Sequence, residues 1–212
     1  MQELILSLMS KYGYFAVFAL IAIENIFPPI PSEVILIGGG FLTTTIDLNV
    51  YIMIIAATLG SVIGAIALYF IGKIFNKERL KKIISGKIGK VLRLKEKDID
   101  MADEWFDKKG NITVFFCRFI PIVRSLISIP AGMSEMPMIK FLVYTTVGSL
   151  IWNTVLIFIG NRVGDNWESI LGIFDQYSHI VLIILVIIFI GFIIWFYKFR
   201  KKSKKKNDIK SD

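Results

Sequence analysis

The sequence predicts an all-α, polytopic membrane protein: an inverted-topology repeat with two opposed re-entrant hairpins, plus transmembrane helices. The first observation is the distribution of charge. Of the 25 Lys and Arg residues in the 212-residue chain, 12 lie within residues 73–109 and 8 within residues 198–210. Almost uncharged apolar stretches separate these blocks, whereas a soluble domain interleaves the two kinds of residue. The second observation is an internal similarity between the two halves. We expect a single membrane domain over residues 1–212.

Four segments are apolar enough to cross a bilayer as helices, which takes roughly 20 apolar residues each. The first is short. It lacks a basic n-region and an A-x-A-like cleavage site, so it does not resemble a cleaved signal peptide. We expect transmembrane helices at about residues 12–27, 50–72, 141–160 and 180–197.

Two further apolar stretches, residues 27–40 and 118–132, are interrupted by Pro and Gly. Proline removes a backbone donor and clashes one turn back, so neither stretch fits one regular helix. Non-helical backbone at membrane depth is tolerated only where it is buried in protein or lines a watery cavity. These stretches therefore predict re-entrant hairpins, with breaks expected at Pro29, Pro31, Pro121, Pro130 and Gly132.

The charged segments predict the orientation in the membrane. Residues 73–109 carry 12 basic and 7 acidic residues, and the tail, residues 198–212, carries 8 and 2. Basic segments stay in the cytoplasm, so we expect the linker (residues 74–110) and the C-terminal tail there. Residues 161–178 hold three acidic residues and one Arg and should lie outside. The helices ending at Gly72 and Gly160 then point in opposite directions.

The internal similarity pairs residues 60–73 with residues 148–161, where 7 of 14 positions are identical. The two Pro-containing stretches also align, so we expect repeat 1 at about residues 12–73 and repeat 2 at about 111–162. Chance is the competing explanation, because Ile, Gly and Phe dominate membrane sequences. The opposed helix directions instead favour an inverted duplication, which recurs in secondary transporters with sites near the membrane midplane.

Ionisable residues inside a membrane are costly, so each one is a candidate functional group. Glu24 and Glu33 accompany the first hairpin, and Arg118 and Arg124 flank the break in the second. Two arginines can hold a phosphate through paired charge-assisted hydrogen bonds. A low-dielectric cavity favours the protonated carboxylate, so the glutamates can load and release a proton or gate the cavity. Two structural alternatives stay open: a purely structural ion network, and an Arg118 side chain that snorkels to the interface.

Several other classes of function are disfavoured. The chain has one Cys and one His, which excludes a disulfide framework, a Cys/His metal site and a histidine-dependent lipid phosphatase. We expect no enzyme activity, no metal, no cofactor and no nucleic-acid partner. Gly60-x-x-x-Gly64 is a small-residue packing face that also permits a homodimer. Asn153 is expected to bond across helices rather than line a cavity.

The residues around the two hairpins resemble the DedA family, whose members share the VTT, or SNARE-associated Golgi protein, domain. The resemblance covers roughly residues 12–164. Its specific part is F-x-R-F-x-P-x-x-R-x5-P-A-G, which begins at Phe116, and a looser part is F-P-P-I-P-S-E, which ends at Glu33. The family's functional acidic and arginine positions match Glu24, Glu33, Arg118 and Arg124, although many members have Asp where this chain has Glu33.

The resemblance implies a flippase that returns undecaprenyl phosphate, a lipid carrier of cell-wall synthesis, across the bacterial cytoplasmic membrane. Arg118 and Arg124 would hold the phosphate, and Glu24 and Glu33 would couple or gate its movement. One alternative is a flippase or scramblase for phosphatidylethanolamine or general phospholipids on the same scaffold. Another is a non-transporting membrane assembly factor.

Overall fold

A computed structural model describes residues 2–27, 31–84, 96–121, 123–164 and some positions between 176 and 191. The chain divides into two compact units, Met1–Gly172 and Ile173–Asp212, and all helices with assigned bounds lie in the first. Most of the predicted helix at residues 180–197, and the whole tail at 198–212, fall outside the described residues.

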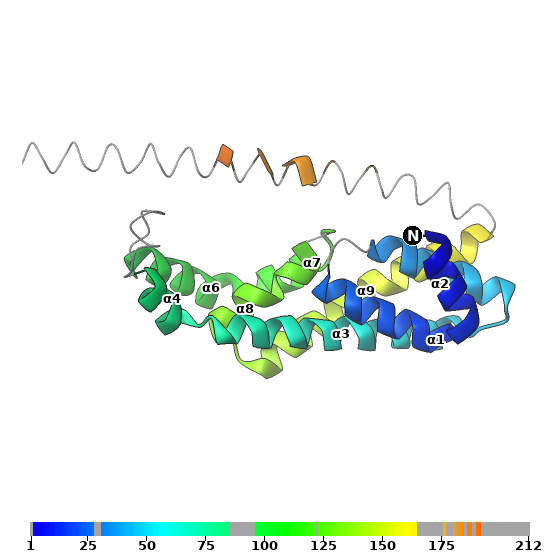
Figure 1. Ribbon diagram of the computed structural model, residues 1–212, viewed down its shortest axis with the longest axis horizontal. Helices are drawn as coiled ribbons and strands as arrows, with labels where there is room; N and C mark the ends of the chain where they lie inside the picture. Colours follow the sequence, from blue (N-terminus) through cyan, green and yellow to red (C-terminus); the bar gives the residue numbers. More distant parts are fainter. Residues whose placement is uncertain are drawn as a thin grey trace, which may run out of the picture. The chain divides into compact units, whose positions relative to one another are not determined.

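The first unit contains three long apolar helices (Figure 1): α1 (Gln2–Ile26), α3 (Val50–Ile74) and α9 (Met138–Val163). Within the described residues, these three are long and apolar enough to span a membrane, which confirms three of the predicted helices. The first is longer than predicted. It continues towards the N-terminus through Gly13, whose φ of +54° kinks the helix at a conformation that glycine adopts readily.

The two Pro-containing stretches form shorter helices. In the first, Pro31 precedes α2 (Ser32–Thr45) with an extended backbone, because the residue that caps a helix lies outside the helical region. Pro29 lies outside the described residues. In the second stretch, a turn follows α6 (Glu96–Cys117) and leads into two short helices, α7 (Val123–Leu126) and α8 (Ser128–Met133).

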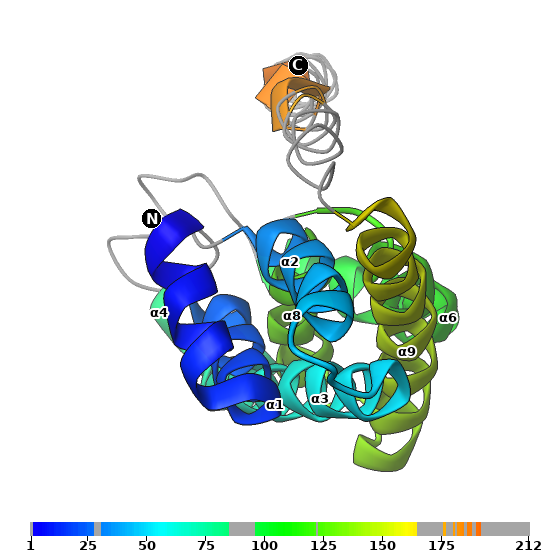
Figure 2. The ribbon, with the colours of Figure 1, turned by 90° about the vertical axis from the view of Figure 1, so that its right-hand side faces the viewer.

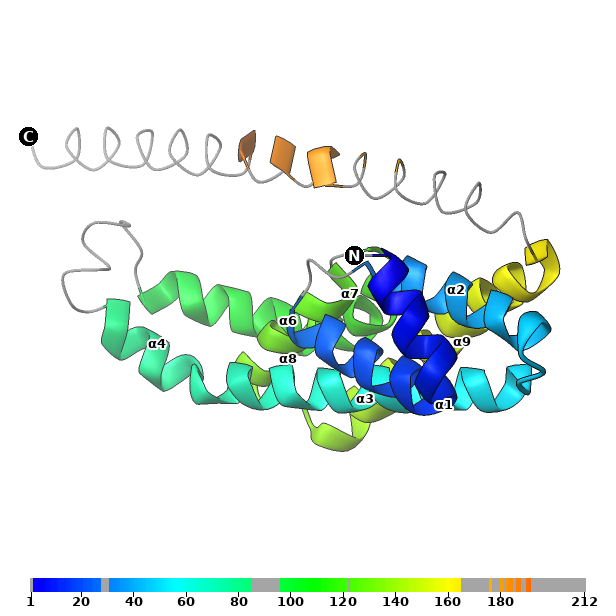
Figure 3. The ribbon, with the colours of Figure 1, turned by 45° about the vertical axis from the view of Figure 1, so that its right-hand side comes forward.

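The predicted basic linker is largely helical where it is described. Lys77 lies at the start of α4 (Lys77–Ile84), which runs beside the N-terminal part of α6 (Figure 3). Its Nζ lies 3.0 Å from Asp100 Oδ1 and 2.9 Å from Asp103 Oδ2, while Lys81 Nζ lies 2.7 Å from Asp100 Oδ1. Hydrogen bonds from Lys81 and Lys77 lower the pKa of the Asp100 carboxyl. Helix α6 then continues without a break past residue 110, the predicted end of the linker.

Helix α1 packs tightly along α3. A Cβ on Gly60 would overlap the carbonyl oxygen of Phe18, and one on Gly64 would lie 2.6 Å from the Cβ of Asn25. The predicted packing face is therefore confirmed, but its partner is inside the same chain. Because α1 covers these glycines, they are not free to form a homodimer.

Helices from different halves of the chain also pack against each other. Helix α2 lies along α9, and α8 lies along α3 (Figure 2). At each contact a glycine of one helix lies against a backbone carbonyl of the other, so close that any Cβ would overlap it. The pairs are Gly40 with Ile157, Gly160 with Ile37, Gly132 with Tyr69, and Gly72 with Ile129.

These crossed contacts correspond position by position when the two predicted repeats are aligned. Gly40 aligns with Gly132, and their carbonyl partners Ile157 and Tyr69 align with each other. The correspondence supports the repeat. The inverted topology and the re-entrant paths of the hairpins stay predictions.

We expect Gly40→Ala to lower the thermal unfolding temperature of the detergent-purified protein by several degrees. Its Cβ would overlap the Ile157 carbonyl, and overpacking of this kind costs about 1–3 kcal/mol. The matched control is Gly39→Ala on the same helix, whose Cβ would lie 3.5 Å from Met9 Cε in ordinary contact. That control should be neutral or slightly stabilising, because Ala is the better helix former. Equal losses in both variants would contradict the crossed contact.

Candidate functional site

All four ionisable residues predicted from the sequence are buried. The exposed fractions are 3% for Glu24, 7% for Glu33, 1% for Arg118 and 2% for Arg124. They come from four different elements: α1, α2, the turn after α6, and α7. Glu24 interacts electrostatically with the other three. The structure therefore brings together residues that are up to 100 positions apart in the chain.

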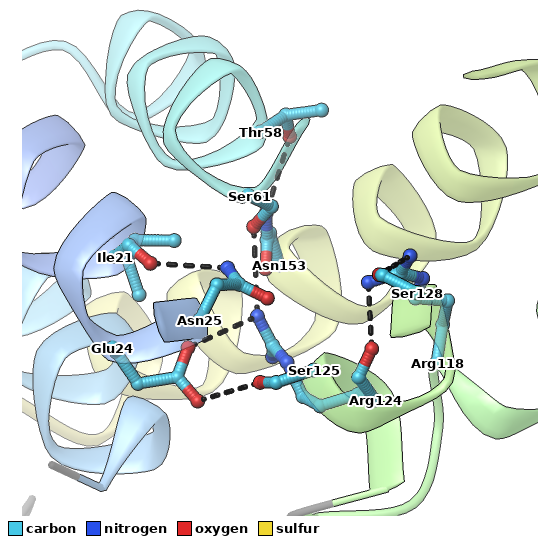
Figure 4. A network of polar contacts seen from close by, with 10 residues as sticks. All are labelled: Ile21, Glu24, Asn25, Thr58, Ser61, Arg118, Arg124, Ser125, Ser128 and Asn153. Atoms are coloured by element: carbon cyan, nitrogen blue, oxygen red, sulfur yellow. Dashed lines mark hydrogen bonds and ion pairs between the residues drawn. The ribbon is translucent and has the colours of Figure 1, made fainter. Parts of the chain in front are cut away.

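Arg124 lies between the first helix and the third, and its polar contacts are long (Figure 4). Its Nη2 lies 3.9 Å from Glu24 Oε2 and 3.5 Å from Ser61 Oγ, and Ser125 Oγ donates to Glu24 Oε1 at 3.3 Å. Short charge-assisted hydrogen bonds measure about 2.7–2.9 Å. The Arg124 guanidinium is thus loosely held, and its Nη1 has no partner.

Arg118 is held much more firmly. Its Nη1 donates to the Arg124 carbonyl at 2.6 Å, and its Nη2 donates to Ser128 Oγ at 3.0 Å and to Thr145 Oγ1 at 2.9 Å. Its guanidinium also lies 5.9 Å from the centre of the Phe141 ring, within cation–π distance. Arg118 therefore ties the turn to α8 and α9, and its burial contradicts the snorkelling alternative.

Neutral polar residues complete this network. Asn153 Nδ2 donates to Thr58 Oγ1 at 3.3 Å and to Ser61 Oγ at 3.2 Å, which confirms the predicted bond across helices (Figure 4). Asn25 Nδ2 donates to the Ile21 carbonyl one turn earlier on α1. Sequence reasoning did not select Asn25 or Ser61. The available signal was weak: an Asn directly after Glu24, and a Gly-Ser pair near the middle of an apolar helix.

Unpaired polar atoms gather around the same residues. Seven buried side-chain atoms of the described residues have no hydrogen-bond partner. Leaving such a group unsatisfied costs about 1–3 kcal/mol, so an accumulation of them indicates a place where a polar ligand binds. The donors are Arg118 Nε, Arg124 Nη1 and Trp152 Nε1, and the acceptors are Glu24 Oε2, Asn25 Oδ1, Glu33 Oε1 and Asn153 Oδ1.

In the second Pro-containing stretch, the first predicted break coincides with a turn. Pro121 is buried in the turn between α6 and α7. Pro130 and Gly132 instead lie inside α8, where Pro130 occupies the first turn. A missing N–H costs little there, because the first four N–H groups of a helix have no intrahelical acceptor. Gly132 serves the contact with α3 described above.

The described residues of the site form no cluster of metal-ligating side chains. In the described ranges, no group of three or more His, Cys, Asp or Glu residues is placed to hold a metal ion. The charges available to a ligand there are those of the two glutamates and two arginines.

Comparison with known proteins gives a family and several relatives. Residues 30–162 match the VTT domain. The "Alkaline phosphatase-like protein" of Lactococcus lactis subsp. lactis (strain IL1403) is 58% identical over 98% of this chain and 97% of its own length. The "Undecaprenyl phosphate transporter A" of Staphylococcus aureus is 39% identical over 87% and 90%. "Protein DedA" of Escherichia coli is 28% identical over 74% and 73%. No solved structure matches.

Arg118→Lys should destabilise the protein, because the ammonium group of lysine cannot reproduce the planar guanidinium that makes the three hydrogen bonds of Arg118. Each charge-assisted hydrogen bond that is lost contributes about 1.5–3 kcal/mol. Thermal unfolding in detergent measures this loss. The matched control is Arg79→Lys, since the exposed side chain of Arg79 donates to the Ile74 carbonyl. If the two variants unfold at the same temperature, Arg118 does not hold the turn.

Proposed function

Because the chain belongs to the DedA family of VTT-domain membrane proteins, we propose that it is a lipid translocase that returns undecaprenyl phosphate across the cytoplasmic membrane. One observation carries the proposal: a buried, loosely paired arginine in a chain that is 39% identical to a protein named undecaprenyl phosphate transporter A. Arg124 and the free Nε of Arg118 would bind the phosphate.

The charges of the site suggest how a phosphate could enter. The charges of two arginines and two ionised glutamates sum to zero, so the site does not attract an anion strongly in that state. Protonating Glu24 would remove the counter-charge that lies 3.9 Å from the Arg124 guanidinium. The freed guanidinium could then bind the phosphate. Proton uptake and phosphate binding would therefore be linked.

The scaffold is suited to pass a headgroup while its lipid tail stays in the bilayer. Glu24 belongs to the first predicted repeat, and both arginines belong to the second. The crossed glycine contacts support two equivalent halves, an arrangement that secondary transporters use to open a midplane site to either side. The proposed activity breaks no covalent bond.

Purified protein in liposomes should move undecaprenyl phosphate between leaflets, and Arg124→Gln should slow this transport about 10–100-fold. The variant loses the charge that binds the phosphate and the charge-assisted bonds that it makes. A leaflet-specific quenching assay measures the rate. The control Arg79→Gln changes an exposed arginine on α4 and should transport normally.

Other outcomes would redirect the proposal. Equal transport of phosphatidylethanolamine would make the protein a general scramblase. Release of inorganic phosphate would make it a phosphatase, as the name of the Lactococcus relative suggests. Movement of neither lipid by folded protein would favour an assembly factor.

Glu24→Gln should remove the pH dependence of transport. Wild-type transport is expected to rise as the pH falls, because protonation frees Arg124. The amide of the variant is neutral at every pH and can still hydrogen-bond to Ser125. The control Glu78→Gln, in the first turn of α4, should keep the wild-type pH profile. A wild-type profile in Glu24→Gln would exclude Glu24 as the coupling group.

A further inference from the structure

Trp152 carries an indole N–H group beside the candidate site and has no role in the function proposed above. It lies near the middle of α9, between Met138 and Val163, too far from either end to act as an interface anchor. Its Nε1 is buried without a hydrogen-bond partner. An N–H group at this depth has no bulk water available, so it requires an acceptor from protein or ligand.

The position of Trp152 is fixed relative to the turn that carries Arg118. Its ring packs edge-on against Phe119, with 6.4 Å between centroids and 73° between ring planes. One helical turn earlier, a Cβ on Gly148 would lie 3.0 Å from the Cβ and Cγ of Arg118. The close approach at Gly148 therefore brings α9 and its indole up to the arginine turn.

Trp152 adds a third donor nitrogen to the two unpaired guanidinium nitrogens. Arg118 Nε, Arg124 Nη1 and Trp152 Nε1 are the buried side-chain nitrogens without a partner among the described residues. Resting on the function proposed above, we propose that Trp152 donates to the phosphate and makes the site selective for phosphate monoesters over phosphodiesters. A monoester has three terminal oxygens, one for each of the three donor nitrogens, and a diester has two.

Charge favours the same class of ligand. A phosphate monoester carries about −1.5 to −2 at pH 7. The two arginines together carry a charge of +2, which a monoester dianion balances. A diester carries one negative charge and would leave one buried arginine uncompensated, which is unfavourable at low dielectric.

Binding of two small probes to the purified full-length protein tests this inference. The probes are dodecyl phosphate, a monoester, and its methyl ester, a diester, each titrated calorimetrically in detergent. Trp152→Phe keeps the ring and removes only the N–H. We expect it to bind dodecyl phosphate about tenfold more weakly, equal to about 1.4 kcal/mol, and to bind the diester as wild type does.

The control is Trp105→Phe, the same change at a tryptophan that is 55% exposed on α6. It should leave both affinities unchanged. The monoester-to-diester affinity ratio is measured within each variant, so a partial loss of folded protein does not alter it.

The outcomes separate this inference from the proposed function. If Trp152→Phe keeps the wild-type ratio while Arg124→Gln loses dodecyl phosphate, the role of Trp152 is overturned and the phosphate site stands. If wild type binds both probes equally, the selectivity is overturned. If Arg124→Gln binds dodecyl phosphate as wild type does, the proposed phosphate site itself is overturned, and the inference with it.

Discussion

The architecture depends on one constraint: a charge removed from water must find its partners inside the protein. Arg118 meets it with three hydrogen bonds, to the Arg124 carbonyl and to the hydroxyls of Ser128 and Thr145. These bonds join the turn after α6 to α7, α8 and α9. Because the backbone of Arg124 is itself one of the acceptors, the firmly held arginine positions the loosely held one.

The two arginines consequently have different roles. Four of the five N–H groups of Arg118 lie on its two terminal nitrogens, and contacts within the protein engage both nitrogens. Arg124 makes only contacts of 3.5 Å or longer through its side chain and keeps Nη1 unpaired. A ligand can displace contacts of that length at little cost, because they are weak to begin with. Arg118 therefore builds the site, whereas Arg124 is available to bind.

The long helices and the four charged residues were predictable, because apolar length and intramembrane charge are local properties of the sequence. The neutral part of the network was not. Ser and Thr are ordinary residues of membrane helices, and the partners that give them a role here are distant in the chain: Ser125 bonds Glu24 across 101 positions, and Asn153 bonds Ser61 across 92. Only the packing of α1, α3, α7 and α9 reveals which hydroxyls face the charges. The breaks in the second Pro-containing stretch were also less predictable, since Pro130 fits inside α8.

The contacts around the site are of two kinds, close backbone contacts at glycines and long polar contacts between side chains. This difference bears on mechanism. Gly40 and Gly132 hold α2 and α8 against the helices of the opposite half, with backbone touching backbone. The polar links between Arg124, Glu24 and Ser61 are long by comparison. A phosphate that enters the site competes only with the long links. Binding can thus exchange one set of polar partners for another without repacking the glycine contacts that hold the two halves together.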